Sequence, residues 1–294
     1  MSTPATPKDA ATVVLLRDGA AGLEVLMVRR KKGAAFMAEA LVFPGGRVDD
    51  EDIVSHPVTG AEAIGEEATI AEIGGDRAHA LTCCVAAIRE VFEEAAVLLA
   101  VDGSGAPLRD NLSPELCEGR EAVHAGTRGF RELCAELDLR LDVGALVFFA
   151  RWITPEAEMN RRFDARFYLA AMPPGQTPAH DPIELTEHVW ATPQALLDDI
   201  RSKLPPPTQW HLTDLARHRT VSDALGWARG RRVATVRPKL VGDPVTGGPM
   251  IVLPWDSEYP SLPGATFPLD RSVPVAGPLS RFVLFDGKWR GSAK

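Results

Sequence analysis

The sequence has few cysteines and no long apolar run, and both absences restrict the classes of protein to consider. Its 294 residues contain four cysteines, and no two of them form a Cys-x-x-Cys pair. This spacing suits no zinc site, so the four thiols are expected to be reduced core residues. No apolar run approaches the ~18 residues that a membrane-spanning helix requires. Residues 1–9 also lack an apolar signal region, so we expect a cytoplasmic protein without a membrane partner.

Positive charge is also scarce, because 32 lysines and arginines stand against 40 aspartates and glutamates, for a formal net charge of -8. Proteins bind the nucleic-acid backbone through basic surface, so this balance argues against a nucleic-acid partner. It does not exclude a small phosphorylated ligand, which a local group of arginines and metal ions can hold. With 45% hydrophobic and 24% charged residues, the chain can bury a sizeable core in one elaborate domain or two small ones.

The most informative stretch is residues 89–94, Arg-Glu-Val-Phe-Glu-Glu. In a helix, which turns by roughly 100° per residue, Glu90, Glu93 and Glu94 fall on one face. Like charges at this spacing each destabilise a bare helix by roughly 0.2–0.5 kcal/mol, and a divalent cation would reverse that effect. Clustered carboxylate oxygens suit Mg²⁺ or Mn²⁺. The alternative is a solvated acidic face on which Arg89 pairs with Glu93.

A second motif, the Phe-Pro-Gly-Gly of residues 43–46, precedes a run of acids at residues 49–52. Two glycines after a proline allow a tight turn and a close approach of the backbone. A glycine turn, an acid and Arg-Glu-apolar-any-Glu-Glu follow one another in the signature of the Nudix hydrolases, and the chain resembles that family. Gly46 and Asp52 keep the first spacing of the signature, and residues 89–94 match its last block.

The chain departs from the family pattern at three points. Asp52 stands where the family has a glutamate, and Glu51 beside it could serve instead. The interval from Asp52 to Arg89 is far longer than in the family, which marks an insertion at about residues 53–78 that could form a lid over the substrate. Ala96 replaces the glycine that usually closes the helix, so the helix is expected to continue beyond it.

The resemblance implies an α/β fold, a Nudix-type α/β/α sandwich with a mixed sheet. Strands are expected at residues 11–16, 23–28, 41–43, 145–153, 166–171 and 184–190, and helices at 79–100, 114–139, 194–203 and 208–229. Residues 1–10 are expected to be disordered, 11–229 to form the Nudix domain, and 230–294 to form a C-terminal extension packed on the core, which could also mediate a homodimer.

The insertion, together with Trp-Ile-Thr-Pro at residues 152–155 and the segment 162–167, is similar to the branch with peroxisomal acyl-coenzyme A diphosphatases and their bacterial relatives. This similarity implies metal-dependent hydrolysis of a small-molecule nucleoside diphosphate linked to another moiety, with coenzyme A or acyl-coenzyme A as the first substrate. A separate coenzyme A signature fits at Leu26, Arg30 and Phe43 but not at Val28, Ala35 and Glu39, so it does not support this choice. The alternatives are ADP-ribose, NADH or a dinucleoside polyphosphate as substrate, or a non-catalytic binding module of the same fold.

The site residues follow from the motifs and from the resemblance. The metal ligands are expected to be Glu90, Glu93 and Glu94, with Arg89 orienting Glu93 or meeting Asp52. The first candidate for a general base is Glu187, on a late strand that also carries Glu184. Guanidinium groups match phosphate oxygens in pairs, and glycines let the backbone approach them. The candidates for substrate binding are therefore Arg30, Gly45, Gly46, Arg162 and Arg166.

Overall fold

A mixed β-sheet forms the centre of the protein. The computed structural model describes residues 4–33, 37–53, 56–65, 67–157, 161–199, 201–229, 231–267 and 279–293. In these residues the sheet has the strand order β10-β2-β1-β9-β8-β11, with β3 paired to β2 and β4 to β1. Its strands are β1 (Lys8–Gly19), β2 (Gly22–Arg30), β3 (Leu41–Val42), β4 (Gly45–Arg47), β8 (Val147–Ile153), β9 (Phe163–Ala171), β10 (Leu185–Ala191) and β11 (Thr235–Val236). The central pair, β1 and β9, is parallel, and β2 runs antiparallel to β1.

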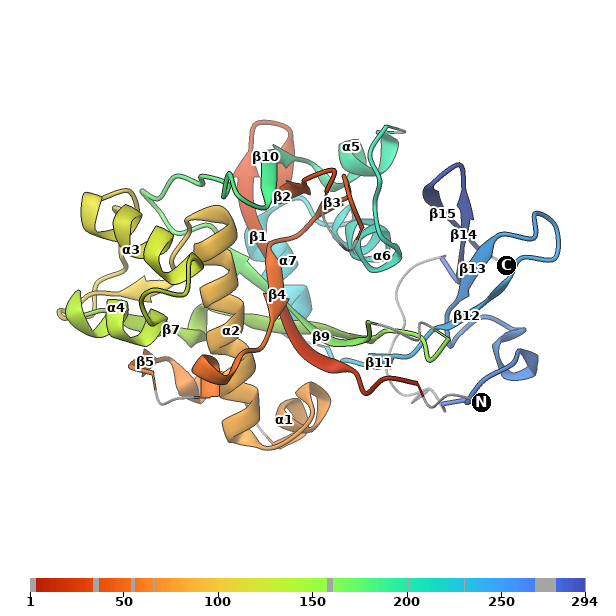
Figure 1. Ribbon diagram of the computed structural model, residues 1–294, viewed down its shortest axis with the longest axis horizontal. Coiled ribbons are helices and arrows are strands. Elements are labelled where there is room, and N and C mark those ends of the chain that lie inside the picture. The colour runs from red at the N-terminus through yellow and green to blue at the C-terminus, as the bar shows by residue number, and fades with distance from the viewer. Residues whose placement is uncertain are drawn as a thin grey trace.

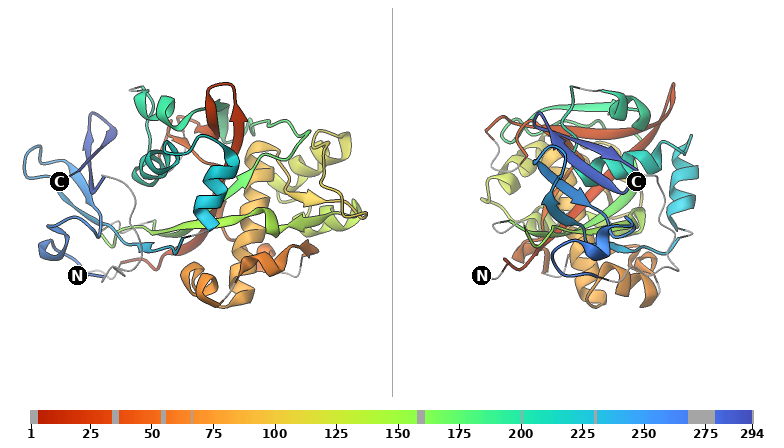
Figure 2. Two further views of the ribbon diagram at one scale, coloured as in Figure 1. Left: turned by 180° about the vertical axis from the view of Figure 1, so that it is seen from behind. Right: turned by 90° about the vertical axis from the view of Figure 1, so that its right-hand side faces the viewer.

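Helices cover both faces of this sheet (Figures 1 and 2). The long helix α2 (Arg77–Ala95) packs on one face, and α6 (Pro206–Leu215) and α7 (Val221–Arg229) pack on the other, with α5 (Pro193–Asp198) beside them. Successive side chains of a strand point to opposite faces, so a strand covered on both sides is apolar throughout. In β1, Val13 and Leu15 belong to one buried cluster, while Val14 and Leu16 belong to the other. The expected α/β fold with a mixed sheet is confirmed.

The insertion and the segment after α2 form a smaller subassembly around a three-stranded sheet, β5-β7-β6. Its elements are η1 (Asp50–Ile53), β5 (Val58–Thr59), η2 (Ala61–Ile64), α1 (Glu67–Ile73), β6 (Ala100–Val101), α3 (Pro114–His124), α4 (Phe130–Glu136), β7 (Arg140–Asp142) and η3 (Val143–Ala145). Strand β5, from the insertion, pairs in parallel with β7. The insertion is therefore built into the fold through backbone hydrogen bonds. None of the helices in the described ranges is long and apolar enough to cross a membrane.

The C-terminal segment forms a second sheet at one end of the molecule (Figure 1). Its strands are β12 (Lys239–Gly242), β13 (Pro249–Val252), β14 (Arg281–Phe285) and β15 (Lys288–Ser292), paired in that order, and the short helix η4 (Tyr259–Ser261) packs with it. We call residues 239–292 the C-terminal lobe. It contacts the core through a row of indole rings, in which Trp210 lies 5.8 Å from Trp152 and 5.6 Å from Trp255 between ring centroids.

Several boundaries differ from those expected from the sequence, among them the end of the helix expected over 194–203, which stops at Asp198 in α5. The helix expected over residues 114–139 is two helices, α3 and α4, separated by a turn at Gly126, which has a φ of 66°. The helix expected over 208–229 is likewise divided into α6 and α7, and it begins at Pro206, because proline is tolerated in the first turn of a helix. Strand β1 begins at Lys8, within the segment expected to be disordered.

Helix α2 ends at Ala95, and the expected continuation through residues 97–99 is wrong. Ala96 adopts the left-handed conformation, with a φ of 58°, as the family's glycine would. Its carbonyl accepts a hydrogen bond from the Asn111 side chain at 2.8 Å, and the side-chain amide of Gln176 bonds both the N–H and the C=O of Leu98. These tertiary hydrogen bonds replace the helical ones, so the chain leaves the helix although an alanine stands at its end.

An Ala96→Gly variant tests this account of the helix end. A β-carbon disfavours the left-handed conformation, so removing it is expected to increase the free energy of unfolding by about 0.5–1 kcal/mol. Ala95→Gly, one residue earlier in the helix, is the control and is expected to lower it by about 1 kcal/mol. Denaturant unfolding of the three proteins measures both effects, and equal destabilisation by the two glycines would contradict the assignment.

Candidate active site

The glutamate-rich end of α2 lies against the glycine motif, which forms strand β4 rather than an isolated turn. The backbone N–H of Gly45 donates a hydrogen bond to Glu94 Oε2 at 2.9 Å. A β-carbon on Gly46 would lie 2.5 Å from both carboxylate oxygens of Glu90, and one on Gly45 would lie 2.6 Å from the backbone of β1. Gly45 therefore requires glycine for steric reasons, because the backbone of β1 leaves no room for a side chain. At Gly46 a side chain would displace the Glu90 carboxylate.

Arg89 organises the acidic cluster from within it. Its guanidinium is nearly buried and donates two hydrogen bonds to Asp52, at 2.8 and 2.9 Å, in a bidentate pair. The remaining terminal nitrogen donates to Glu90 Oε1 at 3.0 Å and to Glu93 Oε1 at 2.9 Å. Asp52 thus takes the place of the family's glutamate in the structure, and Arg89 fixes the orientation of two carboxylates, in agreement with the role expected from the sequence.

Burial makes the carboxylates of this cluster hard to ionise. Burial, together with the neighbouring charges of Glu94 and Glu93, raises the pKa of Glu90 to about 8, although Arg89 lowers it. Burial also raises the pKa of Glu94 to about 7, although the Gly45 N–H lowers it. A bound cation would favour the ionised form of these carboxylates, because its positive charge offsets their mutual repulsion.

The cluster has the donor chemistry of a site for a hard divalent cation. Glu90, Glu93 and Glu94 each use one carboxylate oxygen in the hydrogen bonds described above, which leaves one oxygen of each for a metal ion. Oxygen ligands of this kind suit Mg²⁺ or Mn²⁺. Among the described residues, no three metal-binding side chains are close enough to form a closed site, so the cation would have to draw these carboxylates together.

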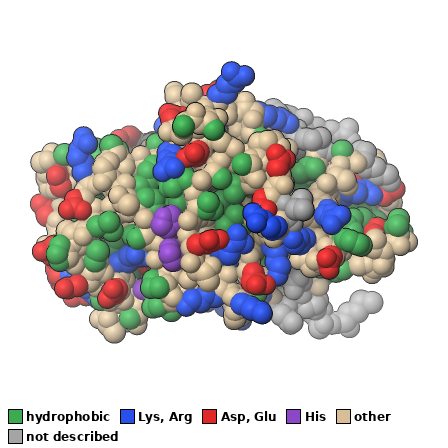
Figure 3. Space-filling view, turned by 90° about the horizontal axis from the view of Figure 1, so that it is seen from above, with side chains coloured by type: hydrophobic (Ala, Val, Ile, Leu, Met, Phe, Trp, Pro, Cys, Tyr) green, Lys and Arg blue, Asp and Glu red, His purple; other side chains and the backbone are tan. Residues whose placement is uncertain are grey.

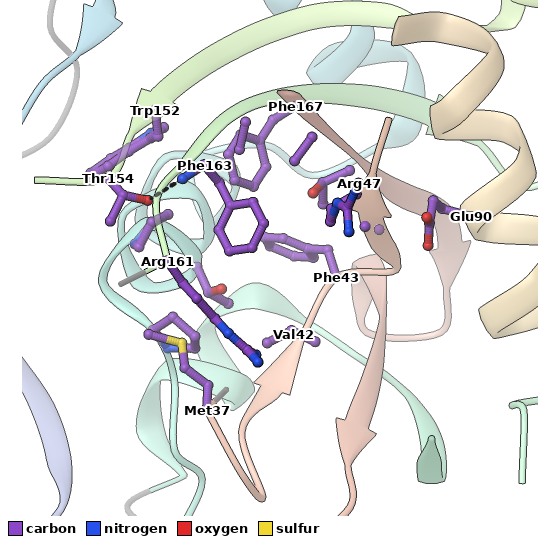
Figure 4. Close-up of a pocket in the computed structure, with 18 of the residues that line it drawn as sticks. Met37, Val42, Phe43, Arg47, Glu90, Trp152, Thr154, Arg161, Phe163 and Phe167 are labelled. Carbon is purple, nitrogen blue, oxygen red and sulfur yellow. Dashed lines mark hydrogen bonds between the residues drawn. The ribbon is translucent and has the colours of Figure 1, made fainter. Parts of the chain in front are cut away.

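A cavity of about 650 Å³ extends from this cluster along the sheet toward the C-terminal lobe. Figure 4 shows Phe43, Phe163 and Phe167 between Glu90 on one side and Trp152 and Thr154 on the other. Glutamates line the acidic end of the cavity, and the side chains along the rest of its wall are mainly aromatic and aliphatic. Such a cavity has the size and character of a small-molecule binding site.

The structure brings some of the expected binding residues together in this cavity and separates others. Arg30, Gly45 and Gly46 line it, together with Arg89 and the three glutamates. The Nε atom of Arg30 is buried and has no hydrogen-bond partner among the described residues, although its charge lowers the pKa of Glu94. Arg30 is therefore available to an anionic ligand at the acidic end of the cavity.

Arg162 and Arg166 lie outside the cavity, and strand alternation explains why. Phe163, Ala165 and Phe167 of β9 line the cavity, so the residues at even positions point to the opposite face. Arg166 is 2% exposed and pairs with Asp9 and Asp164. Arg162, just before the strand, donates to backbone carbonyls at residues 5 and 154. Both arginines are structural in these contacts.

Glu187 is likewise not among the cavity residues. Its side chain is half exposed and pairs with Arg29, which is its neighbour across the β2–β10 pair. Glu184 does line the cavity, and its charge raises the pKa of Glu94, so it lies close to the acidic cluster. A register shift between Leu185 and Glu187 breaks the simple alternation along β10. Of the two acids considered from the sequence, Glu184 is the one in the site.

Several lining residues carried no motif in the sequence. His124 of α3 lies 3.6 Å from Glu93 Oε2 and 3.7 Å from Asp181. Arg161 also lines the cavity, whereas its sequence neighbour Arg162 does not. Arg161 lies two residues before Phe163, so extending the alternation of β9 back beyond its first residue would have suggested that it faces the cavity. On the face of the molecule seen in Figure 3, Lys and Arg side chains gather around the middle. No described residue of the insertion lines the cavity, so the insertion does not form a lid in this structure.

Comparisons with known proteins agree with this geometry. The sequence profile of the NUDT19 Nudix domain matches residues 63–215, just over half of the chain. The acyl-coenzyme A diphosphatase NUDT19 of Xenopus laevis is 25% identical over 309 residues, covering 90% of this chain and 81% of that protein. The human protein of the same name is 32% identical over 201 residues, covering 64% of this chain and 51% of its own.

A solved structure supports the fold. The crystal structure of a NUDIX hydrolase from Alicyclobacillus acidocaldarius is similar to this chain, with a TM-score of 0.59 and 28% sequence identity. The alignment covers 75% of this chain and 96% of that one. The expected Nudix-type arrangement is therefore confirmed.

A Gly46→Ala variant tests the fit between β4 and Glu90. The added methyl group would displace the Glu90 carboxylate, and misplacement of a catalytic group by about 1 Å can cost about 100-fold in rate. We expect a loss of that order in kcat/KM for any diphosphate the protein cleaves, with weaker Mn²⁺ binding. Gly33→Ala is the matched control, because nothing lies within 4 Å of a β-carbon there. Unchanged Mn²⁺ affinity in Gly46→Ala would contradict the proposed fit.

The raised pKa of Glu90 predicts a pH dependence of stability. Between the ordinary carboxyl pKa of 4.5 and about 8, folded Glu90 holds more protons than the unfolded chain does. Without metal, stability should therefore fall as pH rises through this window, by about 1–3 kcal/mol. Glu90→Gln should remove most of that decline, and added Mn²⁺ should reverse it in the wild-type protein. Denaturant unfolding between about pH 5 and pH 8 measures the slope, and identical slopes for both proteins would sink the idea.

Proposed function

The chain belongs to the NUDT19 Nudix domain family of Nudix hydrolases, enzymes that act on diphosphates, and on this premise we propose that its substrate is coenzyme A or an acyl-coenzyme A. The observation that carries the proposal is the continuity of one cavity. It begins at the acidic cluster of Glu90, Glu93 and Glu94 and continues into a long, mainly apolar region. The curated relatives named acyl-coenzyme A diphosphatase support the same choice.

We assign the cation, Mg²⁺ or Mn²⁺, to Glu90, Glu93 and Glu94. A bound cation would lower the pKa of water and neutralise charge on the diphosphate. Arg89 holds Glu90 and Glu93 in orientation, and the Gly45 N–H does the same for Glu94. These contacts preorganise the carboxylates before the ligand arrives, which limits the reorganisation needed during reaction.

The other cavity residues supply binding and proton transfer. Arg30 is the cationic side chain placed to meet the diphosphate at the acidic end, because it has no ion-pair partner among the described residues. Arg161 lies farther along the cavity, on the side of Thr154. Glu184 lines the same end as Glu94 and is our candidate for the general base, which takes a proton from the attacking water. The reaction adds that water across the phosphoric anhydride, so that one phosphate receives the hydroxyl group and the other leaves.

A substrate panel tests the proposed function. Purified protein is incubated with coenzyme A, an acyl-coenzyme A, ADP-ribose, NADH and a dinucleoside polyphosphate, with and without Mg²⁺ or Mn²⁺, and the products are identified by mass. We expect metal-dependent release of 4′-phosphopantetheine or its acylated form. Glu93→Gln should lower kcat/KM by at least about 100-fold, because it removes a ligand of the cation. Glu118→Gln, on the exposed face of α3, is the control and should leave turnover unchanged.

The other outcomes have defined meanings. Cleavage of ADP-ribose, NADH or the dinucleoside polyphosphate in preference to coenzyme A would keep the chemistry and replace the substrate. Binding of a nucleotide without turnover, and without dependence on metal, would instead identify a binding module of the Nudix fold.

A further inference from the structure

The C-terminal lobe forms a wall of the active-site cavity. Leu240 of β12, Ile251 of β13 and Trp289 of β15 line it, and Pro238 lines it just before β12. The lobe therefore does more than cover the core, because it closes the end of the cavity that lies away from the glutamates.

The sheet of the lobe has two apolar faces with different surroundings. Leu240, Ile251 and Phe282 are successive partners across β12, β13 and β14, so their side chains share one face. This face meets the cavity and the core. The opposite face carries Met250 and Val252, which pack with Tyr259 in a small core of the lobe itself. Leu240 and Ile251 are only half buried, so part of their hydrocarbon surface faces the cavity.

The rest of the wall at this end of the cavity is also mainly apolar, with Arg161 as a cationic exception. It includes Trp152, Phe163 and the prolines 205–207 (Figure 4 for the first two). Thr154 lies there too, but its hydroxyl oxygen already accepts a hydrogen bond from the Phe163 N–H at 3.0 Å. A nucleobase needs partners for its ring nitrogens, and this lining offers few of them. This end of the cavity suits a hydrocarbon group better than a base.

We propose that the C-terminal lobe forms a subsite for the acyl chain of the substrate, with Leu240 and Ile251 as specificity-determining residues. The inference rests on the proposed function, since it places the diphosphate at the glutamates and the acyl group at the far end of the same cavity. It assigns the lobe a role in selecting substrates by chain length. The chemistry at the diphosphate is unchanged by it.

Binding measured across a series of chain lengths tests this subsite. The dissociation constants of coenzyme A and of its butyryl, octanoyl and dodecanoyl thioesters are measured by calorimetry without metal, so no turnover occurs. Each methylene that becomes buried should raise affinity by about two- to fourfold. Leu240→Thr should weaken binding of the octanoyl and dodecanoyl forms by about tenfold and leave coenzyme A unchanged. Val241→Thr, the neighbouring residue on the opposite face of the sheet, is the matched control and should change neither.

The result separates this inference from the proposed function. Affinity that does not depend on chain length overturns the subsite, even if coenzyme A is cleaved. Affinity that rises with chain length and is flattened by Leu240→Thr supports the subsite, even if the protein cleaves another diphosphate. Equal loss for all four ligands in Leu240→Thr also overturns it, because the wall would then contact the nucleotide portion. Ile251→Thr replaces Leu240→Thr if circular dichroism shows that the latter does not fold.

Discussion

The buried ion pair between Arg89 and Asp52 is the interaction on which the site depends. It joins α2 to η1, two elements that are far apart in the sequence, and it leaves the second terminal nitrogen of Arg89 to hold Glu90 and Glu93. A buried ion pair contributes little net stability, since desolvation offsets most of its attraction. Its value here lies in orientation, because a bidentate guanidinium fixes the direction of the remaining donor.

The negative charge of the carboxylates around this pair is only partly offset by neighbouring cationic side chains. Glu90 and Glu94 are buried near each other, and burial raises the pKa of both. The glycines of β4 allow the backbone to approach these carboxylates, while Arg30 and Glu184 add one charge of each sign at the same end. A site of this kind binds a cation and an anionic substrate together more readily than either alone, because each offsets the charge of the other.

The C-terminal lobe forms part of the cavity wall in this Nudix hydrolase. The contacts of Trp210 with Trp152 and Trp255 attach the lobe to the core, and the face beside them continues into the cavity wall. Attachment and cavity thus depend on the same apolar surface. The insertion, in contrast, is tied into the small sheet by β5 and stays away from the cavity.

The sequence by itself determined the parts of this protein that depend on local periodicity. The helical repeat places Glu90, Glu93 and Glu94 on one face of α2, and the apolar run of β1 requires cover on both sides. Tertiary structure decided what local rules leave open. Ala96 ends α2 because Asn111 and Gln176 supply hydrogen bonds from elsewhere in the chain.

Tertiary structure also decided which polar side chains reach the cavity. Alternation groups Arg162 with Arg166 and separates them from Phe163, but only the packing of the sheet determines which face meets the cavity. Glu184, just before β10, likewise lines the cavity, whereas Glu187 pairs with Arg29 at the surface. The wall at Leu240 and Ile251 was not visible in any motif, because a binding surface built from ordinary aliphatic residues is defined only by what lies opposite it.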